Sequence, residues 1–179
     1  MRDVSYRVAL GGIVSALCLI SMFIAGIVPA LYLLLPMASG VLLMIIASEV
    51  SIQWAFLTYI SVSILSLFIT ADKEASLVFI MLFGHYPIIR FYVQKIKISL
   101  LRFIVKFVIF NFCAISFFFV TVYLFGVEQM LDSMEEIGKY GKPVMLCAVN
   151  IIFVLYDLNL QAIYEIYRHR FMKRLKRKK

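Results

Sequence analysis

Residues 8–48 read VALGGIVSALCLISMFIAGIVPALYLLLPMASGVLLMIIAS, and no charged side chain interrupts them. As one helix these 41 residues would extend about 61 Å at ~1.5 Å per residue, twice the roughly 30 Å hydrocarbon core of a bilayer. Two membrane spans with a tight turn between them account for this length, and Gly26 and Pro29 mark the turn. The second of these spans contains Pro36 and Gly40.

The rest of the chain continues this apolar character. Of its 179 residues 64% are hydrophobic, and the mean hydropathy of +0.99 is typical of an integral membrane protein. We expect an all-α fold, a six-helix membrane bundle that forms one domain over residues 1–179. The six spans are expected at about 8–25, 30–47, 50–70, 75–93, 101–125 and 143–167, with a polar segment at 128–142 and a basic tail at 168–179.

The basic residues fall mainly on one side of these predicted spans. Six spans place both termini on the same side, and 15 of the 18 Lys and Arg residues share that side. Only Lys73, Lys139 and Lys142 fall on the other side. Cytoplasmic loops carry an excess of Lys and Arg, so we expect a multi-pass protein of a prokaryotic cell membrane with both termini cytoplasmic. The basic tail either serves only as this topology signal or also contacts anionic lipid head groups; nucleic acid is not an expected partner.

The fourth predicted span contains an ionisable ring. If the span begins at Glu74, His85 lies about 16 Å along a helix and near the middle of the membrane. An ionisable group at that depth is costly and indicates a functional site. Pro87, two residues later, would loosen the helix backbone at this depth. The alternative interpretation is that His85 is a hydrogen-bonded structural histidine in a tilted helix.

The sixth predicted span carries a polar stripe. Asn150, Asp157 and Tyr164 recur at seven-residue steps, and Gln161 joins the same helix face. Polar groups in a membrane need partners, so the stripe is expected to face the bundle interior or a cavity. Asp157 lies in the cytoplasmic half and requires a counter-charge. Lys106 and Arg90 lie at comparable depth, and a structural ion pair joining spans four, five and six is the favoured interpretation.

We expect His85, Tyr86, Asn111 and Asn150 to line a pocket that opens outward, on the basis of their depth alone. The outer ends of spans three and five add Ser63, Ser66, Ser116, Thr121 and Tyr123. Aromatic walls with a few polar groups suit a small organic ligand. The alternative is that the mid-membrane polar residues only pair with one another.

Small residues recur at helical spacing in the first predicted span. Ala9, Gly12 and Ala16 form one line, with Gly11 and Ser15 beside it. Such spacing lets another helix approach closely. The line is either a docking face for a partner protein or a packing face against a neighbouring span.

No catalytic motif is present in the sequence. It lacks Gly-x-Ser-x-Gly, His-Glu-x-x-His and a P-loop, and its only histidines are His85 and His169. The three cysteines lie in apolar runs without metal-ligand spacing. We therefore expect a protein that is not an enzyme and has no cofactor or metal. If ATP drives transport, another chain must supply the nucleotide site.

Four features resemble the substrate-binding S components of energy-coupling factor (ECF) transporters, in an uncharacterised subgroup. The opening at residues 7–16 is similar to the small-residue first helix of that family, although Gly and Ser partly replace its usual alanines. The turn from Pro29 to Pro36, followed by Ala-Ser-Gly at 38–40, is similar to the entry of its second helix. The stretch Phe83–Pro87 resembles the fourth helix of some members, and the polar segment before the last span matches in place and length.

The resemblance implies a six-span fold with both ends cytoplasmic. It also implies a transport mechanism. An S component captures a vitamin or similar small micronutrient from outside and docks through its first helix on a transmembrane coupling subunit that carries two cytoplasmic ATPases. By matching position, Gly12 and Ala16 would be docking residues, whereas no ligand residue carries over. A scaffolding membrane protein of the cell envelope and a self-contained small carrier remain the alternatives.

Overall fold

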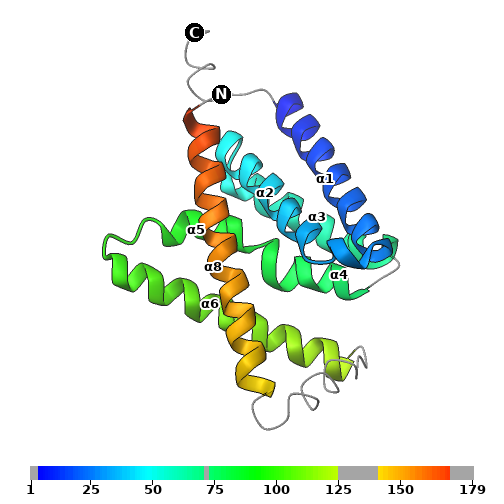
Figure 1. The fold of residues 1–179 in the computed structure, drawn as a ribbon. Helices are drawn as coiled ribbons and strands as arrows, with labels where there is room; N and C mark the ends of the chain where they lie inside the picture. The colour runs from blue at the N-terminus through cyan, green and yellow to red at the C-terminus, as the bar shows by residue number, and fades with distance from the viewer. Residues whose placement is uncertain (1–3, 71–72, 125–140, 170–179) are drawn as a thin grey trace.

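A computed structural model describes residues 4–70, 73–124 and 141–169 (Figure 1). These residues form helices joined by short connections, and none of them forms a strand. Five helices are long and apolar enough to cross a membrane. The chain is therefore an all-α protein with the features of a multi-pass membrane protein, as the sequence predicts.

The first three helices form a closely packed group. Helix α1 spans Val4–Ile27, a 3-10 turn η1 spans Pro29–Leu31, and α2 and α3 span Leu34–Glu49 and Ile52–Ile69. Each of the three contacts both others, and they lie side by side in Figure 1. Cys18, Leu43 and Val62, one from each helix, are fully buried among them. Their apolar faces therefore supply one of the two hydrophobic cores found among the described residues.

The fourth span is interrupted. It consists of α4 at Lys73–Val78, a π-helical turn η2 at Phe79–Phe83 and α5 at Tyr86–Val93. The Gly84 N–H donates to the Phe79 carbonyl, five residues back, at 2.7 Å. Pro87 has no N–H to donate to the Phe83 carbonyl, so the α-helical pattern fails at the same place. The break predicted at Pro87 is present.

The last two long helices cross one another in Figure 1. Helix α6 at Ser99–Phe119 continues as the π-helical turn η3 at Val120–Leu124, and α8 spans Gly141–Tyr167. Aromatic rings join them to α5: Phe153 of α8 stacks on Phe110 with ring centroids 4.1 Å apart and meets Tyr86 edge-on at 4.9 Å. These rings form the centre of the second core.

The second predicted span differs from the structure. Residues 29–31 form a 3-10 turn, so α2 begins at Leu34 and has 16 residues, about 24 Å of helix, which is short of a hydrocarbon core of roughly 30 Å. The last helix begins at Gly141, which places Pro143 within its first turn rather than at its first position. The predicted polar segment at 128–142 and the predicted basic tail at 168–179 lie almost wholly outside the described residues.

Candidate functional site

A cavity of about 460 Å³ lies between α4–η2, α6–η3 and α8, next to the turn after α1. These elements meet in the lower half of Figure 1, away from both chain ends. The lining residues are Tyr32, Leu33, Glu74, Val78, Leu82, Phe83, Phe110, Ala114, Ile115, Phe117, Phe118, Thr121, Met145, Leu146, Val149 and Ile152. Pockets of roughly 300–1,000 Å³ with mostly apolar walls are typical of sites for small organic molecules.

Three of the lining residues carry polar groups. Glu74 lies in the first turn of α4, and its Oε2 accepts a hydrogen bond from the Tyr32 hydroxyl at 3.3 Å. The adjacent Lys73 turns away: its Nζ donates to the carbonyls of Leu67 at 2.6 Å and Thr70 at 3.0 Å. The Lys73 ammonium group therefore caps the C-terminal end of α3.

Thr121 is the third polar residue of the wall. It is 1% exposed, and its hydroxyl oxygen has no hydrogen-bond partner among the described residues. A buried hydroxyl without a partner costs about 1–3 kcal/mol relative to a bonded one. A ligand that bonds to this oxygen would recover that free energy.

The predicted ligand residue His85 lies outside the cavity wall. Its Nδ1 is 3.2 Å from the Ile80 carbonyl, which can only accept, so Nδ1 carries the proton. Nε2 then accepts from the Cys113 thiol at 3.4 Å. The same carbonyl accepts from the Tyr59 hydroxyl at 2.8 Å. His85 thus connects the interrupted span to α6, and Tyr59 connects the same span to α3, as expected for a hydrogen-bonded structural histidine.

The predicted ligand residues Asn111 and Asn150 bond to each other. Asn111 Nδ2 donates to Asn150 Oδ1 at 2.9 Å, and Asn150 Nδ2 donates to Asn111 Oδ1 at 3.0 Å. Each amide also donates to a carbonyl of its own helix, those of Phe107 and Leu146. All four amide hydrogens are therefore used, and neither residue lines the cavity.

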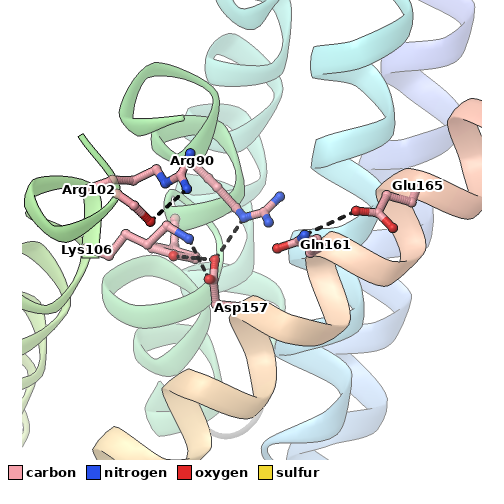
Figure 2. A network of polar contacts seen from close by, with 8 residues as sticks. Arg90, Arg102, Lys106, Asp157, Gln161 and Glu165 are labelled. Atoms are coloured by element: carbon pink, nitrogen blue, oxygen red, sulfur yellow. Dashed lines mark hydrogen bonds and ion pairs between the residues drawn. The ribbon is translucent and has the colours of Figure 1, made fainter. Parts of the chain in front are cut away.

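Asp157 joins three helices (Figure 2). Its Oδ1 accepts from the Tyr86 hydroxyl at 2.7 Å and from Arg90 Nε at 2.8 Å, while its Oδ2 accepts from Lys106 Nζ at 2.5 Å. The Arg90, Lys106 and Asp157 side chains are 3%, 12% and 18% exposed. The predicted contacts of Asp157 with Lys106 and Arg90 are thus present, and Tyr86 joins them instead of lining the cavity. We call these four residues the Asp157 cluster.

Other residues of the predicted polar stripe divide between the interior and the surface. The Tyr164 ring meets Phe91 of α5 edge-on, with centroids 5.6 Å apart. The spacing predicts Gln161 on the same inner face; in the structure it is exposed and donates to Glu165 of its own helix at 3.1 Å (Figure 2). The face turned inward is therefore narrower than the sequence pattern suggested.

The two lines of small residues on α1 face different surroundings. Gly11 faces α3, where a Cβ on it would lie 3.6 Å from the Thr58 hydroxyl. A Cβ on Gly12 would meet no atom of another helix within 4 Å. Ala9, Gly12 and Ala16 are all exposed. The line predicted to dock a partner is therefore open in this chain.

Sequence reasoning missed Glu74 and Tyr32 as wall residues and named Thr121 only as an accessory. Glu74 lies at the start of a predicted span, and an acidic side chain at such a position is typical of a loop at the membrane surface. Its proximity to Tyr32 depends on how the turn after α1 packs, which no local pattern shows.

No family model, curated protein or solved structure matches this chain at a significant level. The cavity and the open face of α1 are therefore the two features from which a function can be inferred.

Proposed function

We propose that this chain is the substrate-binding membrane subunit of an ATP-driven importer of the ECF type. It captures a vitamin or similar small micronutrient from outside and docks on a transmembrane coupling subunit that carries two cytoplasmic ATPases. The cavity of about 460 Å³ carries this proposal. A mostly apolar hollow with polar groups is the arrangement expected for holding a small organic molecule.

The proposed orientation places the cavity on the outside. With α2 counted as a sixth crossing, whose short length is accommodated by local thinning of the bilayer, both termini lie in the cytoplasm, together with 15 of the 18 basic residues. The turn after α1, the start of α4 and the start of α8 then lie at the outer surface. A ligand arriving from outside would meet the cavity first.

The open face of α1 supports the docking step. Ala9, Gly12 and Ala16 are exposed, so another helix can approach the α1 backbone closely. The sequence has no P-loop, and the coupling subunit and its ATPases would supply the energy.

The test is a mild-detergent or nanodisc pull-down of the tagged chain from its native membrane, followed by mass spectrometry. We expect a membrane coupling subunit with ATPases. The Gly12→Leu/Ala16→Leu variant should lose that partner, while Ala162→Leu, at an exposed position of α8, should keep it. Recovery of cell-envelope proteins alone would favour the scaffold, and recovery of the chain alone would favour a self-contained carrier.

A further inference from the structure

The cavity has a buried floor and an exposed rim. Phe83 and Phe117 are among the buried residues of its wall. Leu33, Ile115 and Leu146 also line it, and they are 37%, 50% and 44% exposed. These three are the most exposed residues of the wall, and all three are apolar. The described residues therefore leave the cavity open on an apolar side.

Part of this rim lies at the depth of the membrane interior. Ile115 and Leu146 belong to α6 and α8, which cross in Figure 1 and diverge toward the end of α6 and the start of α8. Ile115 is about 12 Å from Tyr123, the end of its span, at ~1.5 Å per residue. The head-group layer adds only roughly 5–7 Å on each side of the hydrocarbon core, so Ile115 lies at the level of the acyl chains.

The wall also holds a buried hydroxyl group without a partner. Thr121 is 1% exposed, and its Oγ1 has no hydrogen-bond partner among the described residues. A threonine hydroxyl in a helix often bonds to the carbonyl three or four residues earlier, as Thr70 does to Ser66. Thr121 makes no such bond, so its hydroxyl can donate to or accept from an oxygen of a ligand.

The rest of the wall is mainly apolar. Thirteen of the sixteen lining residues are apolar, and four of these are Phe. Glu74 and Tyr32 bond to each other, and each has a further interaction within the chain. An ionised ligand would lose hydration that such a wall does not replace, which is costly. The cavity therefore suits an uncharged molecule.

We propose that the cavity binds an uncharged, largely apolar molecule with one hydroxyl or carbonyl group, which bonds to Thr121. The molecule enters from the outer half of the bilayer, between Ile115 of α6 and Leu146 of α8. This names a membrane-soluble substrate class for the proposed importer and rests on that function for the direction of transport.

The binding experiment uses the full chain in nanodiscs and four probes that share one body. These are biphenyl, 4-phenylphenol, 4-phenylbenzylamine and biphenyl-4-carboxylate. Equilibrium dialysis measures binding, and empty nanodiscs give the background from partition into lipid. We expect saturable binding of 4-phenylphenol that is about fivefold tighter than that of biphenyl, because of one hydrogen bond. The ammonium and the carboxylate should bind about tenfold or more weakly than 4-phenylphenol, because each would lose hydration.

Variants of Thr121 test the assigned hydroxyl. Thr121→Val should bring the affinity for 4-phenylphenol within about twofold of that for biphenyl, whereas Thr121→Ser should retain the difference. Unchanged biphenyl binding by both variants shows that the cavity is intact. The control is Thr58→Val, since the Thr58 hydroxyl donates to the Trp54 carbonyl and Thr58 does not line the cavity. It should leave all four affinities unchanged.

Fluorescence quenching tests the route of entry. Trp54 is the single Trp of the chain, so Trp54→Phe gives a background for one introduced Trp. Ile115→Trp should be quenched by lipids with brominated acyl chains about as strongly as Phe112→Trp, at an exposed position of α6 outside the cavity wall. Quenching of Ile115→Trp by aqueous acrylamide and not by these lipids would overturn entry from the bilayer.

Three results would overturn the ligand class: no saturable 4-phenylphenol binding, equal or tighter binding of either ionic probe, or a 4-phenylphenol advantage that survives Thr121→Val. The pull-down is independent of all three. Selective binding of 4-phenylphenol without a coupling subunit would reject the importer and keep the ligand class. A coupling subunit without this selectivity would do the reverse.

Discussion

The Asp157 cluster and the polar part of the cavity wall, Tyr32, Glu74 and Thr121, are both polar regions within an apolar bundle, but only the second borders an open volume. In the cluster both carboxylate oxygens are bonded to side chains of other helices. In the cavity wall, Thr121 has no partner among the described residues, and Glu74, which accepts from Tyr32, borders an open volume. Polar groups thus mark both regions, and the open volume beside the wall distinguishes a candidate ligand site from a structural contact between helices.

Removing the centre of the cluster should have the largest effect. Asp157→Ala leaves two buried cations without their carboxylate, which should lower the free energy of unfolding by about 3–5 kcal/mol. Denaturant titration of the protein in mixed micelles measures this. Glu165→Ala, at an exposed site on the same helix, should stay within about 0.5 kcal/mol of the unchanged protein. Equal decreases in the free energy of unfolding of the two variants would show that the Asp157 cluster does not stabilise the bundle.

Gly40 allows α2 to approach the interrupted span. A Cβ at this position would lie 2.5 Å from the Phe83 carbonyl oxygen and too close to the Tyr156 hydroxyl as well. Gly40→Ala should therefore cost about 1–3 kcal/mol through overpacking. Gly12→Ala, where the added atom meets open space, should cost nothing or stabilise α1 by up to about 1 kcal/mol. Unfolding midpoints that agree for the two variants would contradict this close contact.

The hydrogen-bonded pair of Asn111 and Asn150 should contribute an intermediate free energy to stability. Asn111→Leu and Asn150→Leu each leave one amide unpaired, and the double variant removes both. A double-mutant cycle should give a coupling free energy of about 0.6 kcal/mol and at most ~1.7 kcal/mol, the range for polar pairs between membrane helices. A coupling near zero would mean that the pair is broken in the folded protein.

The smallest change in the free energy of unfolding is expected in the cavity wall. It tests directly whether polar groups there differ from the bonded groups of the Asp157 cluster. Thr121→Val removes a hydroxyl without a partner, so the free energy of unfolding should be unchanged or rise by less than about 1 kcal/mol. The matched control is Thr70→Val, since the Thr70 hydroxyl contacts the Ser66 carbonyl and the Ser76 hydroxyl. The control should lose about 1–2 kcal/mol. A comparable loss at Thr121 would reveal a partner for it.

Charge-free runs and turn residues are local signals, so the sequence alone predicts an all-α membrane protein, and the described residues contain five helices that are long and apolar enough to cross a membrane. The predicted start of the second span at residue 30 is too early, because residues 30–33 include no charge and no Pro or Gly, although they lie in or directly after a 3-10 turn. The partners of Asp157 could be inferred because a buried carboxylate requires a cation at similar depth. Depth alone could not show whether His85 lines the cavity or, as in the structure, forms a hydrogen bond with the Ile80 carbonyl. That distinction depends on packing between helices far apart in the sequence.

The π-helical turn at Phe79–Phe83 sets the relative direction of the side chains on its two sides. Such a turn amounts to an α-helix with one residue inserted. Residues on its two sides differ by about 100° in direction from an uninterrupted helix. Glu74 of the first part can therefore face the cavity while Arg90 of the second part faces Asp157. Deleting one residue within the turn would remove this offset and turn one of these side chains away, so the cavity wall and the Asp157 cluster depend on the same turn.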